Sequence, residues 1–322
     1  MLTINNYCRA KSLDEAYDLL QNKSNIIIGG MLWLKMQNKT VNTAIDICGL
    51  GLDKIEVKDE KIYIGSMVTL RELETNKLLN ELTYGAFSES VKHIVGVQFR
   101  NLATVGGSVF GRYGFSDIIT LLVALNAEVQ LYAGKTKPLA EFINEPDILI
   151  SISIPNKKRS AAYMSQRNSY ADFPVLTCAL SSSDDGFICS IGARPMRAVA
   201  VKDENGLLAD GITLKSAEAF AEYVSEKVEF GSNQRASSEY RKKICKTLVK
   251  RNFILNGKPV KPSVEADTLL IDLLRDLGCK SVKRGCETSN CGLCTVLMNG
   301  KPVLSCSMLA ARADNQEIYT LE

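Results

Sequence analysis

Four cysteines lie close together near the C-terminal end of the sequence, and their spacing constrains the fold of this chain more than any other feature. They fall within 21 residues in the pattern C-x4-C-x2-C-x11-C, at Cys286, Cys291, Cys294 and Cys306. Three thiols therefore share one short loop. Residues 295–298 and 301–305 are expected to form a hairpin around Asn299-Gly300, a pair that favours a two-residue turn. The hairpin would return Cys306 to the side of Cys294, so that the four sulfurs converge on one site.

The spacing also indicates which metal centre the thiols hold. It matches the plant-type [2Fe–2S] run, in which two bridged irons take four thiolates, two per iron. Zinc is an alternative, because four cysteines suit tetrahedral Zn²⁺, but such sites usually contain two C-x2-C pairs and only one is present. The six other cysteines are scattered singly, as expected of buried thiols in a reducing compartment rather than of a disulfide scaffold. The pattern therefore predicts a [2Fe–2S] cluster.

Composition and charge exclude several classes of protein. The 322 residues are 46% hydrophobic and 23% charged, which is ordinary for a globular chain of two or three domains. The net charge of +3 is too small to indicate binding to nucleic acid or to a membrane surface. No apolar run approaches the ~20 residues that cross a bilayer, and the first residues do not resemble a signal peptide. We therefore expect a cytoplasmic protein. The single histidine, His93, argues against a histidine metal site or a Ser–His–Asp triad.

Local patterns predict a mixture of helices and strands. Capping boxes at residues 12–15 and 69–72 predict two helices, the second continuing to about residue 82. Ser116 and Asp117 are expected to cap a helix over 118–125. Strands are expected at 26–28, 45–47, 61–64, 128–132, 148–154, 174–182 and 186–193, and helices at 215–227, 237–251 and 269–277. Residues 253–255 before Asn256-Gly257 predict a further hairpin.

Two glycine-rich segments are candidates for binding phosphate. Gly29-Gly30 ends the apolar run 26–28, and Gly106-Gly107 lies within residues 103–108. Glycines allow the backbone N–H groups to approach a pyrophosphate closely. Taken alone, each segment is more often only a turn, and Asp117 is more often a helix cap than a ligand of a ribose hydroxyl. Neither segment matches the G-x-G-x-x-G fingerprint of the Rossmann fold.

The C-terminal cysteine segment, LRDLGCKSVKRGCETSNCGLCTVLMNGKPVLSC with IYTLE after it, resembles the [2Fe–2S] domain of molybdenum hydroxylases of the xanthine dehydrogenase family. Residues 1–250 resemble the FAD-binding subunit of the same family. The segments that carry this resemblance are IIIGGMLWLKM, RNLATVGGSVFGRYGFSDIITLLVAL, YADFPVLTCAL, IGARPMRAV and SSEYRKKICKTLVKR.

The resemblance implies a fold class and a domain order. The fold would be α+β, with a two-subdomain FAD-binding fold of the PCMH type over residues 1–158. A small α+β domain of the FAD subunit would follow over 159–250. A β-grasp, ferredoxin-like [2Fe–2S] domain would occupy 251–322.

The resemblance also implies the residues that contact the cofactor. The FAD-contacting set would be Ile26, Ile27, Ile28, Gly29, Gly30, Met31, Leu32, Trp33, Thr104, Val105, Gly106, Gly107, Ser108, Asp117 and Leu149. Four features depart from the family pattern: Met31-Leu32 replaces Thr-Asp, Ser108 replaces Asn, Met164 replaces a frequent Lys, and residues 287–290 replace customary glycines. The first change removes two polar side chains from the expected flavin loop.

By the same resemblance, the chain would be the electron-transfer subunit of a molybdopterin-dependent hydroxylase. Electrons would pass from a molybdopterin-containing partner through the cluster to FAD, and on to a soluble acceptor such as NAD. No protein acid or base is required, so no catalytic residue is assigned. The family's second [2Fe–2S] domain, which is helical, would lie on the partner. Two alternatives remain open: a ferredoxin-like electron carrier or assembly module that has lost FAD, and a binding protein stapled by zinc.

Overall fold

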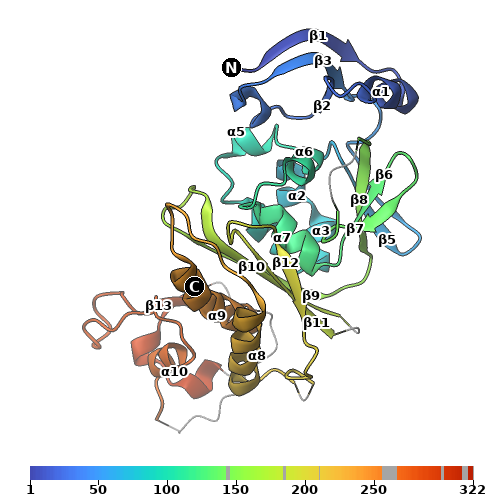
Figure 1. Cartoon of the computed structure of the whole chain (residues 1–322). Coiled ribbons are helices and arrows are strands. Elements are labelled where there is room, and N and C mark those ends of the chain that lie inside the picture. The colour runs from blue at the N-terminus through green and yellow to red at the C-terminus, as the bar shows by residue number, and fades with distance from the viewer. Residues whose placement is uncertain are drawn as a thin grey trace. The chain divides into compact units, whose positions relative to one another are not determined.

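The computed structural model describes residues 1–142, 146–183, 186–209, 211–255, 267–298, 301–313 and 318–321 (Figure 1). Contacts divide the chain into two compact units, Met1–Lys258 and Pro259–Glu322. Helices and strands are mixed in both units, as expected for the α+β class. In the part of the chain that the structure describes, no helix has the length and apolar character needed to cross a membrane. The expected division of the first unit at residue 158 stays a prediction.

The first unit begins with a small parallel sheet in the order β1-β3-β2. Its elements are β1 (Thr3–Arg9), α1 (Leu13–Leu20), β2 (Ile26–Ile28), the 3-10 turn η1 (Leu34–Met36) and β3 (Thr40–Asp46). Ser12 caps α1, because its hydroxyl accepts a hydrogen bond from the Glu15 amide at 3.1 Å. The Glu15 carboxylate accepts a hydrogen bond from the Lys11 amide rather than from the Ser12 amide, so only half of the expected capping box forms.

A five-stranded antiparallel sheet follows, in the order β4-β5-β8-β6-β7. The strands are β4 (Ile55–Lys58), β5 (Lys61–Gly65), β6 (Glu128–Leu131), β7 (Thr136–Pro138) and β8 (Leu149–Pro155). Five short helices share its core: α2 (Leu70–Thr75), α3 (Lys77–Leu82), α4 (Ala86–Val91), α6 (Val105–Gly111) and α7 (Asp117–Ala124). A further short helix, α5 (Val97–Arg100), contacts α2. The interior-facing residues of β5, β6 and β8 are buried isoleucines, valines and leucines, which fix the face that the helices cover.

The capping box of Thr69 and Glu72 is confirmed, but the single helix expected to continue to residue 82 is wrong. Asn76 leaves the helical region with ψ near 117° and starts a new helix. Its side-chain oxygen accepts from the Leu79 amide at 3.0 Å. Asparagine competes well for such a cap, which explains the break between α2 and α3.

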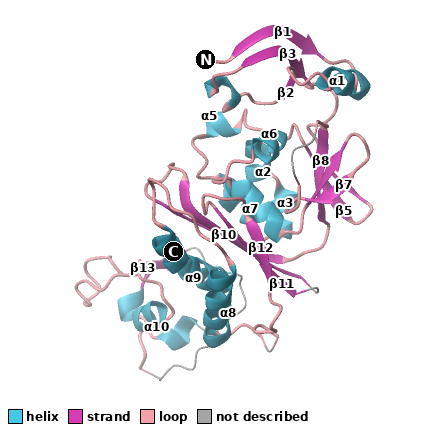
Figure 2. Ribbon diagram, in the orientation of Figure 1, coloured by secondary structure: helices cyan, strands magenta, loops and turns pink. Residues whose placement is uncertain are grey.

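The rest of the first unit is an antiparallel sheet in the order β12-β11-β10-β9, covered on both faces. The strands are β9 (Ser160–Arg167), β10 (Pro174–Ser183), β11 (Gly186–Gly192) and β12 (Val199–Lys202), and the helices are α8 (Leu214–Lys227) and α9 (Ser238–Leu255). α7 contacts β10 and β11, while α9 contacts β9, β10 and α8 (Figure 2). Alternate residues of β10 point to opposite faces of the sheet. Ala179 packs in the core with α7, whereas Cys178 and Leu180 pack in the core with α8 and α9.

One expected strand near the junction is wrong. Residues 253–255 form the end of α9 rather than the first arm of a hairpin. Extending an existing helix adds one hydrogen bond for each residue fixed, and this outweighs a weak local preference for a strand. The expected turn at Asn256-Gly257 lies outside the described residues.

The second unit contains α10 (Leu270–Asp276), β13 (Thr295–Met298), β14 (Lys301–Leu304) and β15 (Ile318–Tyr319), with 3-10 turns η2 (Ser305–Ser307) and η3 (Ala310–Ala313). The sheet order is β14-β13-β15, and both pairs are antiparallel. The expected hairpin of β13 and β14 is confirmed, although its turn, Asn299-Gly300, lies outside the described residues. Cys294 and Cys306 belong to the small core beneath α10.

Candidate cofactor sites

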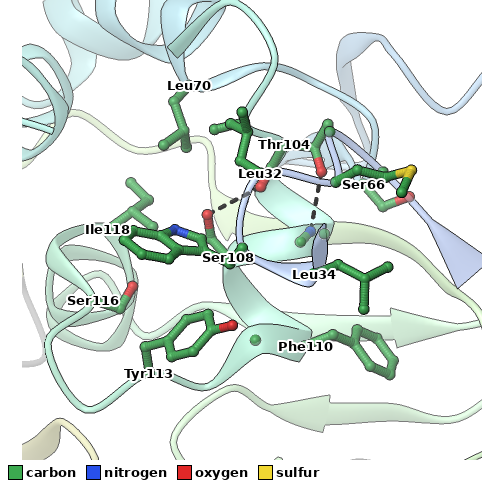
Figure 3. Close-up of a pocket in the computed structure, with 18 of the residues that line it drawn as sticks. Leu32, Leu34, Ser66, Leu70, Thr104, Ser108, Phe110, Tyr113, Ser116 and Ile118 are labelled. Carbon is green, nitrogen blue, oxygen red and sulfur yellow. Dashed lines mark hydrogen bonds between the residues drawn. The ribbon is translucent and has the colours of Figure 1, made fainter. Parts of the chain in front are cut away.

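The first unit contains a cavity of ≈ 570 Å³, which lies within the range of ligand pockets (Figure 3). Its wall is built from the segment after β2, the start of α6, the start of β8 and the loop after β9. These segments lie far apart in the sequence. The cavity therefore depends on the tertiary fold of the unit and not on one continuous motif.

Most residues expected to contact a flavin line this cavity. They are Ile26, Ile27, Ile28, Gly29, Gly30, Met31, Leu32, Trp33, Thr104, Gly106, Gly107, Ser108, Asp117 and Leu149. Val105 is the exception, because its side chain is buried in the core with α7. The structure thus brings the two glycine-rich segments to one wall, as their proposed role requires.

Gly30 is where the two segments meet. A Cβ atom at this residue would lie 1.9 Å from the carbonyl oxygen of Leu102, which is backbone and has no room to yield. A Cβ at Gly29 would lie 2.7 Å from the Thr104 hydroxyl. The glycines therefore allow residues 26–33 to pack directly against residues 102–104, a requirement of close approach.

The backbone amides of the two segments differ in their partners. In the second, Val105 donates to Val68 O at 2.9 Å, Gly106 to Ser66 O at 2.7 Å and Gly107 to the Thr104 hydroxyl at 3.1 Å. These N–H groups are therefore engaged within the protein, contrary to the expectation that they face a phosphate. The second segment is in fact the start of α6, and helix formation accounts for the difference.

In the first segment, the amides of Gly30, Met31 and Leu32 have no acceptor among the described residues. Met31 has a φ of 57°, in the left-handed region. Successive N–H groups around such a residue form a concave site that favours an anion. The backbone of the first segment therefore suits a phosphate even though Met31 and Leu32 have apolar side chains.

Asp117 is engaged within the protein. Its carboxylate accepts a hydrogen bond from the Tyr163 hydroxyl at 2.5 Å and pairs with Arg167. Burial raises the pKa of Asp117 to about 6, and the nearby Arg167 and Tyr163 oppose this rise. The carboxylate is therefore mostly ionised at pH 7 and holds Arg167 at the cavity wall, while Ser116 caps the helix as expected.

The sequence did not identify an aromatic group in the wall of the cavity. The ring of Trp33 lies 5.4–5.9 Å, centroid to centroid, from four other rings. They belong to Phe99, Tyr113, Phe115 and Phe173, which all line the cavity. Tyr113 and Phe115 also stack on each other, with ring centroids 5.1 Å apart. In the sequence, Phe115 directly precedes the Ser116-Asp117 cap, and Phe173 lies within the segment YADFPVLTCAL. These positions beside recognised segments were the only sequence signal for the aromatic group.

In the second unit, Cys286 and Cys291 form an exposed pair. The Cys286 sulfur accepts hydrogen bonds from the amides of Asn290 at 3.3 Å and Cys291 at 3.2 Å, and the Cys286 amide lies 3.4 Å from the Cys291 sulfur. The Thr288 hydroxyl and these amides lower the pKa of the Cys286 thiol to about 6. Such donors stabilise a thiolate, the form that binds a metal.

Cys294 and Cys306 form a second, buried pair. The Ser305 amide and hydroxyl donate to the Cys294 carbonyl at 3.2 and 2.7 Å, which holds η2 beside the end of the cysteine loop. Ser307 contacts the Ser289 hydroxyl across the same loop. The hairpin of β13 and β14 thus brings the fourth cysteine back to the loop. Among the described residues, no three His, Cys, Asp or Glu side chains are grouped as for a single metal ion.

The loop between Cys286 and Cys291 departs from the family pattern. Glu287 and Ser289, which stand where glycines are customary, have φ values of 53° and 64°. Non-glycine residues adopt this region at some cost. The loop therefore has a backbone conformation that suits glycine, although none of residues 287–290 is a glycine.

Comparison with known proteins likewise separates an FAD-binding domain from an iron–sulfur domain. Residues 2–157 match the model of the FAD binding domain in molybdopterin dehydrogenase, and residues 253–319 match that of the 2Fe-2S iron-sulfur cluster binding domain. The carbon monoxide dehydrogenase structure from Hydrogenophaga pseudoflava has a similar fold, with a TM-score of 0.70 at 21% identity over 76% of this chain and 94% of that one.

Two curated relatives cover different parts of the chain. The nicotinate dehydrogenase small FeS subunit of Eubacterium barkeri is 50% identical over 72 residues, 22% of this chain and 46% of the relative. The uncharacterized protein YgfM of Escherichia coli K12 is 25% identical over 253 residues, 76% of this chain and 94% of the relative. The chain thus spans less than half the length of its iron–sulfur relatives. The chain therefore joins a domain of the FAD binding family found in molybdopterin dehydrogenase to a 2Fe-2S iron-sulfur cluster binding domain.

Proposed function

We propose that this chain is the electron-transfer subunit of a molybdopterin-dependent hydroxylase or dehydrogenase. The observation that carries the proposal is the presence, in one polypeptide, of an FAD-binding domain with a ligand-sized cavity and a [2Fe–2S] domain whose four cysteines fall within 21 residues of the sequence. Bound FAD would link the one-electron chemistry of an iron–sulfur cluster to the two-electron chemistry of a soluble acceptor. The chain's own residues would bind and orient the cofactors.

The cavity fits the flavin nucleotide in two respects. The unpartnered amides of Gly30, Met31 and Leu32 would donate to a phosphate, and this does not depend on the side chains that replaced Thr and Asp. Leu149, which is buried at the start of β8, would pack against the cofactor rings. The segment around Thr104 and Ser108 would complete the wall, chiefly through side chains.

The cysteines fit a two-iron centre. Two irons need two thiolates each, and the four thiols form two pairs, Cys286 with Cys291 and Cys294 with Cys306. Amide and hydroxyl donors to the first pair would stabilise the sulfur charge. Burial of the second pair, at 3% and 8% exposure, would keep water from one side of the centre.

The partner proposed for this chain is a molybdopterin-containing catalytic subunit. Its support is the match to the FAD binding domain in molybdopterin dehydrogenase and the relatives' names, which include a nicotinate dehydrogenase and a xanthine dehydrogenase. A second [2Fe–2S] domain would lie on this partner, and a soluble acceptor such as NAD would take electrons from the flavin. We place the complex in the cytoplasm.

A second candidate is a ferredoxin-like carrier or assembly module that has lost FAD. It is favoured by Met31-Leu32 and by the engaged amides of residues 105–107. In this case the cavity would lack a flavin while the cluster remained.

Anaerobic titration with dithionite distinguishes the two candidates. For the proposed function, the visible bands of flavin and cluster are both expected in the purified full chain. Both should bleach over the same titration, because the two centres exchange electrons. Bleaching of cluster bands alone, with no flavin band at any stage, would support the carrier. Two independent centres that never equilibrate would contradict electron transfer within the chain.

A further inference from the structure

Ser66 stands out among the polar residues of the cavity wall. It follows β5 and is only 2% exposed, yet its hydroxyl has no hydrogen-bond partner. Two other buried side-chain atoms share this state among the described residues, His93 Nδ1 and Ser190 Oγ. Ser66 and His93 line the cavity, whereas Ser190 does not. Because burying an unpaired hydroxyl is costly, a missing partner within a ligand cavity points to the ligand.

The backbone of Ser66 is held rigidly at the position where α6 begins. Its amide donates to Ile150 O at 2.9 Å, and its carbonyl accepts from the Gly106 amide at 2.7 Å. A Cβ at Gly106 would lie 2.8 Å from this carbonyl oxygen and 3.0 Å from the Ser66 Cβ atom. Gly106 therefore lets α6 approach Ser66 closely, and the hydroxyl lies beside the second glycine-rich segment.

The neighbouring hydroxyls are already used within the protein. Ser108 donates to the Thr104 carbonyl at 3.0 Å, and the Thr104 hydroxyl accepts from the Gly107 amide (Figure 3). Ser66 retains both its donor and its acceptor capacity. It can therefore supply a donor in the region where the amides of α6 cannot.

We propose that the Ser66 hydroxyl donates a hydrogen bond to a diphosphate oxygen of the bound flavin nucleotide, opposite the amides of residues 30–32. This inference rests on the proposed function, since it requires that the cavity hold FAD. It adds a contact from outside both glycine-rich segments, and it gives Gly106 a positioning role rather than a direct one.

Binding of FAD to the flavin-free full chain tests this contact, with Ser66→Ala and Ser190→Ala as matched variants. Loss of a hydrogen bond to a charged phosphate is expected to weaken FAD binding by about 10- to 100-fold in Ser66→Ala. Binding of ADP, which carries the diphosphate without the flavin, should weaken by a similar factor. Ser190→Ala removes an equally buried, unpaired hydroxyl away from the cavity and should leave both affinities unchanged.

Thermal unfolding of the flavin-free variants separates binding from structure. Both substitutions remove an unpaired buried hydroxyl, so neither is expected to lower the Tm of the flavin-free chain. A lower Tm in Ser66→Ala alone would assign the hydroxyl a structural role and overturn the proposal. Wild-type affinity for FAD or ADP in Ser66→Ala would also overturn it and leave the proposed function intact. If the unaltered chain bound no FAD, both would fail.

Discussion

Replacing Cys306 by alanine is expected to lower the iron content of the purified chain from about two irons to near zero. Cys306 is the only one of the four cysteines that reaches the site from β14 and η2 rather than from the loop. Without it, one iron would keep a single protein thiolate, Cys294. The remaining ligands could not hold that iron against exchange with water and free thiols.

The same change should loosen the second unit. Among the residues of this unit that the structure describes, seven form its buried core, and two of them are Cys294 and Cys306. A core this small contributes little stability, so a bound metal centre contributes much of the folding free energy. Iron analysis and the far-ultraviolet circular dichroism of the full chain would measure both effects.

Cys279→Ala is the matched control, because Cys279 packs against the same core but lies outside the constellation of four. It should retain the cluster. Full iron and sulfide content in Cys306→Ala would mean that the fourth ligand has been assigned wrongly.

Replacing Gly30 by alanine is expected to weaken FAD binding by at least about tenfold. The new methyl group would lie 1.9 Å from Leu102 O, so residues 26–33 and 102–104 would have to separate. That movement would displace the amides of Gly30, Met31 and Leu32 from the cavity. Flavin released on purification, or a titration of the flavin-free chain, provides the measurement.

Gly96→Ala controls for the general effect of a methyl group at a glycine. A Cβ atom at Gly96 would lie 3.0 Å from the Gln98 Oε1 atom, which is the end of a flexible side chain and can move away. This variant should bind FAD as the unaltered chain does. Equal affinities for Gly30→Ala and the unaltered chain would show that the contact between the two segments does not shape the flavin site.

The cysteine site could be predicted largely from the sequence because the residues that form it lie close together along the chain. Three ligands share one loop, and an Asn-Gly pair between strand-forming residues sets the hairpin that returns the fourth. The caps at Thr69 and Ser116 were predictable for the same reason, since a cap depends on residues three positions apart.

Features of the cavity that depend on tertiary contacts could not be predicted. Glycine pairs indicate freedom of the backbone, but not whether their amides face a ligand or, as at Gly106, another part of the protein. The engagement of Asp117 by Tyr163 and Arg167 requires β9 to lie beside α7, which no local pattern specifies. Ser66 carries no motif at all, and only its burial without a partner distinguishes it.

One chain is expected to hold both redox cofactors. Quantitation of flavin, iron, acid-labile sulfide and zinc in the anaerobically purified chain tests it most directly. We expect about one FAD, about two irons and about two sulfides per chain, with no stoichiometric zinc. One zinc per chain without sulfide, or iron and sulfide without flavin, would contradict this account.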